Sequence, residues 1–396
     1  MLRRIGVGII GAGFVANIHA RCYRRMTDLG VEILAVAALP LSEAQAFATK
    51  YGIAHFSDDY RQVLQRPDVQ IVDLCVPNHL HKPFAIEAAK AGKHVICEKP
   101  LTGYFGGDEE NVAATPKAKM LQEALQNADE MIEVAKRCGV KLMYAENWLY
   151  SPAVRKAKAL VEASGGTILE IRAQECHSGS HANHAKEWRY SGGGALMRLG
   201  PHPIGTGLYF KAKEGLRRYG KPISVESLYA EAGDLSKTPS LQEERRWLVT
   251  DWVDVENWAT VLINFSDGSR GVFWVSDISL GGMEDTFELL LSNAHIKGDL
   301  THSTLLRAYA PDPTVFAPEY IQEKLETKAG WSYPSIDEEW MLGYPQELRD
   351  FVEAVTYDRE PLVDVQLGRE VVKVIYAAYL SAEEGRKIRF SELSEK

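Results

Sequence analysis

The sequence predicts an α/β protein of two domains, the first of which is built on a doubly wound parallel sheet. Three observations lead to this prediction. The 396 residues exceed what a single hydrophobic core usually organises. Within residues 1–150, short apolar runs alternate with segments of helical pattern, which is typical of parallel strands joined by helices. After residue 257, apolar runs follow one another across turn-forming residues, which is typical of antiparallel hairpins.

The first expected element is a strand at Ile5–Ile10, a nearly continuous apolar run that fits burial on both faces of a sheet. It leads into Gly11-Ala12-Gly13-Phe14-Val15-Ala16, which fits the pattern G-x-G-x-x-G/A. In this pattern Gly11 permits a tight turn, Gly13 lets a pyrophosphate approach the backbone, and Ala16 allows close packing of helix on strand. The turn, including Phe14 and Val15, is therefore predicted to bind a dinucleotide at the start of the following helix.

Strands and helices continue to alternate after this turn. The expected strands are Val31–Ala38, Ile71–Val76 and His94–Cys97, and the expected helices are Ala44–Tyr51, Pro83–Ala91 and Leu121–Cys138. Ligands bind doubly wound sheets beyond the carboxyl ends of the strands. The residues predicted to contact the cofactor there are Ala38, Pro77, Asn78, His81, Glu98 and Lys99.

The turn after the second strand reads Ala37-Ala38-Leu39-Pro40. It lacks the acid that usually binds the ribose of NAD, and it also lacks an Arg or Lys for the 2′-phosphate of NADP. A phosphate without a cationic partner is poorly held, so NAD is favoured, and NADP remains open.

Composition excludes several classes of partner. The formal net charge is −9, which argues against a binder of the nucleic-acid backbone. No stretch approaches the roughly 20 apolar residues that span a bilayer. The five cysteines are scattered and odd in number, as expected of reduced thiols. We expect a cytoplasmic protein without nucleic-acid or membrane partners.

The later sequence predicts a second domain of strands closed by helices. Trp258–Phe265 and Gly271–Ser276 are strand-like and are joined across Ser266-Asp267-Gly268-Ser269, a hairpin signature, and Phe287–Leu291 is a further strand. Helical spacing follows in the residues after Pro345 and in Gln366–Glu384. We place the first domain at residues 1–147, with an inserted loop at about 102–121, and the second at residues 148–396.

Several motifs together resemble one known family. At Glu98-Lys99-Pro100 the sequence resembles the glucose-fructose oxidoreductase, inositol dehydrogenase and rhizopine-catabolism (Gfo/Idh/MocA) family, of which E-K-P is the most specific mark. Further likeness lies in residues 192–202, 264–268 and 379–386. The resemblance implies a Rossmann domain and an α+β domain with an open, mostly antiparallel sheet. One face of that sheet would carry the substrate pocket and the other an interface of a homodimer or homotetramer.

The resemblance also implies an activity and two catalytic residues. It implies an NAD(P)-dependent oxidoreductase acting on a hydroxyl or keto group of a sugar, sugar acid, glycoside or polyol. Lys99 would lie beside the nicotinamide, after a strand and before a proline whose peptide bond is often cis in the family, and His202 would accept the hydroxyl proton. Two alternatives are a redox glycoside hydrolase, which oxidises C3 transiently, and a cofactor-binding protein without turnover.

One position departs from the family pattern. Four residues before His202, where the family usually has Asp, the chain has Arg198. A planar guanidinium suits an anionic sugar substituent, so Arg198 is a candidate substrate contact. Otherwise it points away and another acid covers the missing role, for which Glu146 and Glu175 are the candidates.

The remaining substrate-binding candidates are Asn147, His177, His181 and Trp188. His177, His181 and His184 lie close in sequence beside Cys176, but their spacing matches no standard zinc pattern. We therefore predict hydroxyl contacts and no metal. The inserted loop begins just after Lys99, which suggests a role in substrate gating or subunit contact.

Overall fold

The computed structural model describes residues 4–302 and 305–393. The chain folds into two compact units. The first unit comprises residues 1–104, 123–150 and 343–372. The second comprises residues 105–122, 151–342 and 373–396. Residues 343–372, expected in the second domain, group with the first unit. The division predicted between residues 147 and 148 stays a prediction.

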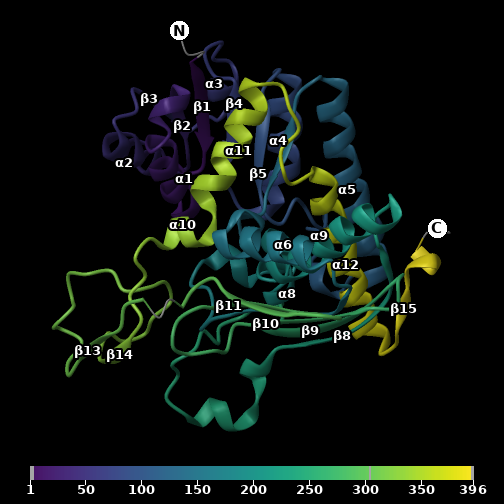
Figure 1. Ribbon diagram of the computed structural model, residues 1–396. Coiled ribbons are helices and arrows are strands. Elements are labelled where there is room, and N and C mark those ends of the chain that lie inside the picture. Colours follow the sequence, from purple (N-terminus) through teal and green to yellow (C-terminus); the bar gives the residue numbers. More distant parts are fainter. Residues whose placement is uncertain (1–3, 303–304, 394–396) are drawn as a thin grey trace. The chain divides into compact units, whose positions relative to one another are not determined.

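The first unit is organised by a parallel sheet of six described strands in the order β3-β2-β1-β4-β5-β6 (Figure 1). The strands are β1 (Ile5–Ile10), β2 (Val31–Ala37), β3 (His55–Ser57), β4 (Ile71–Leu74), β5 (His94–Glu98) and β6 (Leu142–Ala145). The order reverses between β1 and β4, and ligands bind sheets of this kind at such a reversal. The predicted doubly wound sheet is confirmed.

Six α-helices of the described chain lie wholly or mostly in the first unit, together with this sheet. They are α1 (Phe14–Arg24), α2 (Leu41–Tyr51), α3 (Arg61–Leu64), α4 (His81–Lys90), α5 (Lys117–Arg137) and α11 (Tyr344–Thr356). In α1, the small side chains of Ala16 and Ala20 are fully buried, and α1 packs against α11. Helix α5 starts at Lys117, directly after Pro116, so the inserted loop ends earlier than the predicted residue 121.

The second unit is built on a mixed sheet of seven described strands, in the order β12-β11-β7-β10-β9-β8-β15. The strands are β7 (Ile168–Cys176), β8 (Val225–Gly233), β9 (Trp258–Phe265), β10 (Arg270–Ser276), β11 (Glu284–Leu291), β12 (His295–Asp299) and β15 (Ile388–Arg389). Only the β10–β7 pair is parallel among them. The predicted β9–β10 hairpin and the mostly antiparallel sheet are therefore confirmed.

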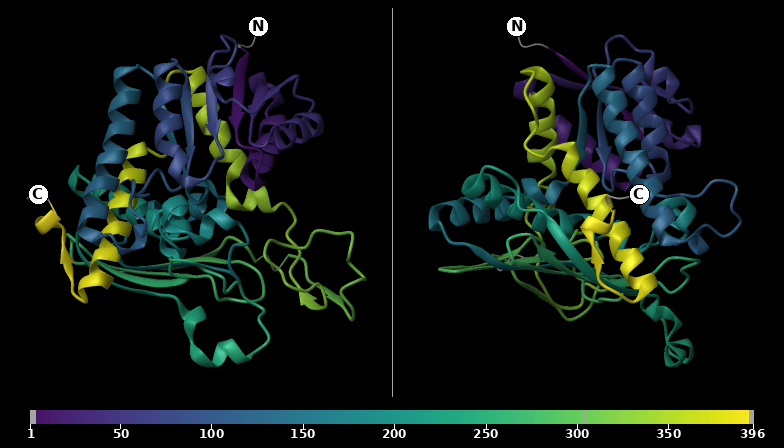
Figure 2. Two further views of the ribbon diagram at one scale, coloured as in Figure 1. Left: turned by 180° about the vertical axis from the view of Figure 1, so that it is seen from behind. Right: turned by 90° about the vertical axis from the view of Figure 1, so that its right-hand side faces the viewer.

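Side chains alternate along these strands between a covered and an exposed face. In β9 and β10, Val261 and Phe273 are buried, whereas Leu262 is 41% and Trp274 is 40% exposed. Figures 1 and 2 show α6 (Pro152–Ser164), α8 (Ala195–Arg198) and α9 (Pro201–Tyr219) on one face of the sheet. The buried apolar side chains of the strands therefore lie on the face of the sheet that these helices cover.

Smaller elements complete the described chain. They are α7 (Trp188–Ser191), α10 (Glu338–Leu342), the β13 (Ala308–Ala310) and β14 (Gly330–Ser332) pair, and α12 (Val365–Glu384). None of the helices in residues 4–302 and 305–393 combines the length and apolar character that crossing a bilayer demands. All five cysteines are free thiols.

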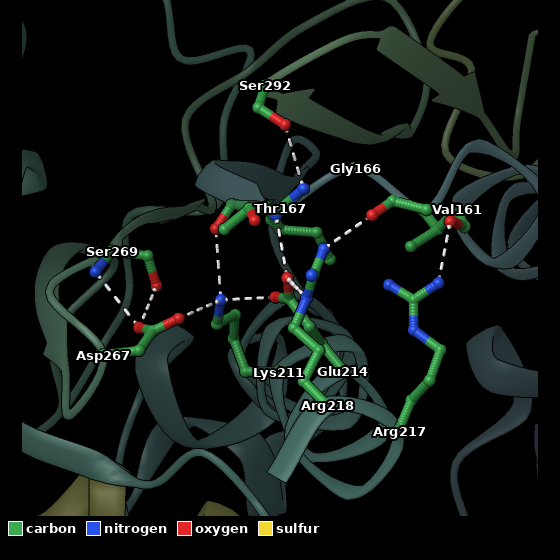
Figure 3. Close-up of polar contacts among 12 residues, drawn as sticks. Val161, Gly166, Thr167, Lys211, Glu214, Arg217, Arg218, Asp267, Ser269 and Ser292 are labelled. Atoms are coloured by element: carbon green, nitrogen blue, oxygen red, sulfur yellow. Dashed lines mark hydrogen bonds and ion pairs between the residues drawn. The ribbon is translucent and has the colours of Figure 1, made fainter.

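A buried charged network joins α9 to the sheet of the second unit (Figure 3). The ammonium of Lys211 donates to Glu214 Oε2 at 2.6 Å, to Asp267 Oδ2 at 2.8 Å and to the Ile168 carbonyl at 3.1 Å. Glu214 Oε1 in turn accepts from the backbone N–H of Ile168 at 3.1 Å. The network thus fastens the helix to β7 and to the turn between β9 and β10.

Candidate active site

The turn between β1 and α1 has the geometry that a dinucleotide requires. Gly11 has φ +108°, and a Cβ there would lie 2.0 Å from the Cys75 carbonyl oxygen, so only glycine fits. A Cβ on Gly13 would meet nothing within 4 Å. The first turn of α1 contains no acidic residue, and no side chain caps it. Its backbone N–H groups and the open space at Gly13 therefore fit a pyrophosphate.

The other predicted cofactor residues of the first unit follow the carboxyl ends of its strands. Ala38 comes directly after β2, and Pro77 and Asn78 open the short 3-10 helix Asn78–Leu80 that follows β4. His81 is fully buried, with Nδ1 2.8 Å from the Pro100 carbonyl and Nε2 3.0 Å from the Val76 carbonyl. Burial lowers the pKa of His81. This ring joins two strand-end segments, and its contact with the cofactor stays a prediction.

Lys99 lies at the end of β5 beside two carboxyl groups of the same unit. Glu98 pairs with Ala145 of β6, so Lys99 and Glu146 follow neighbouring strand ends. Glu98 Oε2 accepts the backbone N–H of Lys99 at 3.1 Å, and the Lys99–Pro100 peptide bond is cis, as the resemblance implied. Burial raises the pKa of Glu146 to about 8, although the positive charge of Lys99 opposes this rise. Glu146 is therefore protonated at neutral pH in the folded protein.

A buried histidine in α1, which the sequence analysis missed, connects to Glu98. His19 Nδ1 lies 2.8 Å from Asp73 Oδ2, and its Nε2 lies 3.2 Å from Glu98 Oε1. The Tyr23 hydroxyl also donates to Asp73 Oδ2, at 2.8 Å. Burial disfavours the charged imidazole, but Asp73 and Cys75 together oppose this effect and raise the pKa of His19. An aspartate inside the apolar strand Ile71–Leu74 was the sequence signal for this network.

Glu347 of α11 completes the cluster. Its side chain is fully buried, and neither oxygen has a hydrogen-bond partner among the described residues. Burial and the nearby charge of Glu98 raise its pKa well above the ordinary range. His19, Glu98 and Glu347 bring one ligand atom each within 4.8 Å of one another, as do His19, Asp73 and Cys75. Glu98, the residue before Lys99, therefore belongs to a cluster of buried carboxyl groups in the first unit.

In the second unit, the predicted catalytic histidine lies in the first turn of α9. His202 is buried, and its Nε2 lies 3.9 Å from Glu175 Oε2, which comes from the end of β7. A carboxylate at this distance stabilises the imidazolium that forms when the ring accepts a proton. Of the two acids proposed to cover the missing aspartate, Glu175 accompanies His202 and Glu146 accompanies Lys99.

Arg198 is paired within the protein. Its Nη2 donates to Oδ2 of Asp277, which follows β10 directly, and the Arg198 Cζ lies 5.1 Å from the centre of the Trp252 ring. Burial raises the pKa of Asp277, and the Arg198 guanidinium opposes the rise. Asp277 was missed by sequence reasoning, although an acid directly after an apolar strand was a usable signal. Direct contact of Arg198 with substrate stays a prediction.

The three histidines of the sequence cluster differ in their surroundings. His177 is buried, and its Nδ1 accepts the backbone N–H of Gly179 at 2.9 Å, whereas His181 and His184 are exposed. Within the part of the chain that the structure describes, these three rings do not form a group with metal-ligand geometry. Hydroxyl contacts from His177 and His181 stay predictions.

The last two substrate candidates are interior residues. Asn147 opens the buried 3-10 helix Asn147–Tyr150 of the first unit. Trp188 of the second unit is 3% exposed, with Tyr379 at 4.9 Å between ring centres and the Lys117 ammonium 4.8 Å from its ring. Lys117 begins α5 directly after the inserted loop, and Arg189 donates to the carbonyl oxygen of Glu109 within this loop at 2.9 Å. The loop is therefore fastened around Trp188, whose contact with substrate stays a prediction.

Comparison with known families gives two matches that together cover most of the chain. Residues 5–146 match the model of the "oxidoreductase family, NAD-binding Rossmann fold", and residues 158–390 match the model of the "oxidoreductase family, C-terminal alpha/beta domain". These are the two Gfo/Idh/MocA models, so the resemblance stated from E-K-P is confirmed. The first unit accordingly carries an NAD-binding Rossmann fold.

Individual relatives agree with this assignment. Levoglucosan dehydrogenase of Pseudarthrobacter phenanthrenivorans is 33% identical over 221 residues, which are 52% of this chain and 51% of that protein. Myo-inositol 2-dehydrogenase of Thermotoga maritima is 24% identical over 98% of this chain and 99% of that protein. The crystal structure of GenD2 from gentamicin A biosynthesis, in complex with NAD, superposes with a TM-score of 0.81 at 25% identity, covering 98% of this chain and 97% of that one. The chain thus spans about half the length of the first of these relatives.

Proposed function

This chain belongs to the Gfo/Idh/MocA oxidoreductase family, and from that premise we propose that it is an NAD-dependent dehydrogenase of carbohydrates. Its substrate would be a sugar, sugar acid, glycoside or polyol, and its reaction the reversible oxidation of a hydroxyl group. The observation that carries the proposal is Lys99 at the end of β5, in the unit that contains the dinucleotide turn and next to the strand end that carries Glu146, whose pKa burial raises. The names of the relatives, levoglucosan and myo-inositol dehydrogenase, support the substrate class.

Each residue has a part in the proposed reaction. Oxidation of a carbinol releases a hydride from carbon and a proton from oxygen; NAD, when bound, supplies the hydride acceptor. The Lys99 ammonium donates to the substrate oxygen and stabilises the negative charge that develops there. His202 accepts the hydroxyl proton, and Glu175 at 3.9 Å stabilises the resulting imidazolium.

The central experiment follows absorbance at 340 nm with purified protein, NAD or NADP, and a panel of sugars, sugar acids, inositols and glycosides. Net formation of NADH is the expected result, and it would identify the substrate class. Released aglycone is measured in the same samples. Aglycone release without net NADH would favour the redox glycoside hydrolase instead, and the absence of both would contradict the proposal.

Cofactor binding has a test of its own at Gly13. The φ of this residue is −76°, which any L-residue adopts, and its Cβ position is open, so Gly13→Val is expected to fold normally. The new side chain occupies the space proposed for the pyrophosphate, and NAD affinity should fall at least about tenfold, or 1.4 kcal/mol. Fluorescence titration with NAD measures the loss, and an unchanged melting temperature without ligand serves as the control.

The exposed face of the sheet in the second unit supports a homodimer or homotetramer. Leu169, Leu262 and Trp274 on β7, β9 and β10 are 53%, 41% and 40% exposed, and large exposed apolar side chains on neighbouring strands favour association. Light scattering coupled to size-exclusion chromatography measures the number of subunits. A monomer at micromolar concentration would contradict this part of the proposal.

A further inference from the structure

Arg198 and Asp277 form a charged pair in which the two partners differ in exposure. The Arg198 side chain is 12% exposed, whereas the Asp277 side chain is fully buried. The Trp252 ring lies 5.1 Å from the Arg198 Cζ and holds the guanidinium in place. Arg198 therefore keeps an exposed edge, and its charge is balanced from the inside by a carboxylate.

Asp277 differs from a purely structural counter-ion. Its Oδ2 accepts from Arg198, but its Oδ1 accepts no hydrogen bond from the residues that the structure describes. His177 Nδ1 lies 3.3 Å from this oxygen, yet the same nitrogen accepts the N–H of Gly179 and so carries no proton to donate. Burying a carboxylate oxygen without a hydrogen bond costs free energy. Holding Arg198 in position therefore does not by itself explain why Asp277 is buried here.

A second cation lies near the pair. The Lys324 ammonium donates to the Gly179 carbonyl at 3.1 Å, and its charge acts on Asp277. Removal of the Asp277 charge would therefore leave two positive groups without this counter-ion.

We propose that Asp277 determines the charge of the substrate that Arg198 accepts, an inference that rests on the proposed function. With Asp277 ionised, the pair has no net charge, and the N–H groups of Arg198 bind hydroxyl groups of neutral sugars and polyols. A substrate carboxylate at the same edge would be repelled by Asp277 and would compete with it for the guanidinium. The chain thus carries a potential anion site that its own aspartate neutralises.

The test compares a neutral substrate with the matching acid. The probes are the neutral sugar of highest turnover in the panel and its uronic acid, which differ only in a hydroxymethyl group and a carboxylate. We expect the wild-type protein to favour the neutral sugar in kcat/KM. Asp277→Asn keeps the shape of the side chain and removes its charge, so the ratio of acid to neutral kcat/KM should rise roughly tenfold to hundredfold.

A double variant identifies the group responsible. In Asp277→Asn/Arg198→Met the guanidinium is absent while Lys324 is unchanged, so the ratio should return toward the wild-type value. An unchanged ratio in folded Asp277→Asn would overturn the inference, and so would a wild-type preference for the acid, which needs no variant and holds even if Asp277→Asn does not fold. Failure to reduce NAD with any member of the panel would instead contradict the proposed function, so the two failures are distinguishable.

Discussion

The chain buries two charged networks that differ in how completely their polar atoms are used. In the second unit, Lys211 donates to three oxygens, of Glu214, Asp267 and Ile168 (Figure 3). In the first unit, Glu347 is equally buried, but neither oxygen accepts a hydrogen bond from the described residues, and its pKa is raised. A saturated network fixes structure, whereas carboxyl groups with raised pKa values are ready to exchange protons, as catalytic sites require.

The largest expected effect is a loss of folding stability when Lys211 is removed from the network in the second unit. Lys211→Met leaves Asp267 without this cation and the buried Glu214 with Arg218 as its remaining cationic partner among the described residues, and should lower the free energy of unfolding by about 3–5 kcal/mol. Turnover per folded molecule should not change, because Lys211 is part of no proposed catalytic step. Chemical denaturation measures the loss. Arg217→Met on the same helix, an exposed position, is the matched control and should stay within about 0.5 kcal/mol.

The next effect is on catalysis in the other unit. Lys99→Met should lower kcat at least about a hundredfold, the usual contribution of a positioned acid–base group, while NAD binding is largely retained. Steady-state kinetics and NAD titration measure the two quantities. Lys90→Met, on α4 of the same unit, should leave both unchanged. Wild-type turnover in Lys99→Met would remove Lys99 from the proposed mechanism.

The third prediction concerns Glu146, whose raised pKa makes the stability of the folded protein depend on pH. Its pKa is about 8 in the folded protein and about 4.5 when exposed, so the folded state binds this proton more tightly between these values. The corresponding stability is therefore present at low pH and is lost as the pH rises through about 8. Between pH 6 and pH 9 the loss is roughly 2–3 kcal/mol.

Glu146→Gln cannot ionise, and its stability should vary less over this pH range than that of the wild type. Thermal unfolding without ligand at pH 6, 7, 8 and 9 measures the difference. Glu162→Gln, at an exposed position paired with Lys158, is the matched control and should follow the wild-type curve. Parallel curves for Glu146→Gln and the wild type would contradict the proton on Glu146.

The smallest expected effect is a gain in the free energy of unfolding, whereas Lys211→Met is expected to lower it. Glu347→Met replaces a buried carboxyl that has no hydrogen-bond partner among the described residues by an apolar side chain of similar length, and should stabilise the protein by about 1 kcal/mol. Chemical denaturation at pH 8 measures it. Destabilisation by this substitution would mean that Glu347 is a structural group like Glu214, and the contrast between the two networks would then fail.

Local patterns were enough to predict most of the framework. The alternation of apolar strands with helices predicted the parallel sheet, and Ser266-Asp267-Gly268-Ser269 predicted the β9–β10 hairpin. The element ends differ by a few residues, as at Lys117, because helix ends depend on capping and packing as well as on periodicity. The short β13–β14 pair was not predicted, since strands of three residues carry no clear period.

The site was predictable only where residues lie in a motif. Gly11, Lys99 and His202 were found because each belongs to a recognisable local pattern. His19 and Asp73 lie 54 residues apart, and Arg198 and Asp277 lie 79 apart, so their pairing depends on the register of the folded sheets. Arg198 was therefore recognised as unusual, but the carboxylate that neutralises it was not.

The first unit contains chain from both ends of the sequence, and this has a consequence for biosynthesis. Glu347, Leu348 and Phe351 of α11 are fully buried, and α11 packs against α1. A ribosome therefore synthesises more than three hundred residues between the two helices before they can meet. Helix α11 can join the Rossmann sheet only after residues 344–356 have been synthesised, and a nascent chain truncated before residue 344 lacks this helix of its cofactor-binding unit.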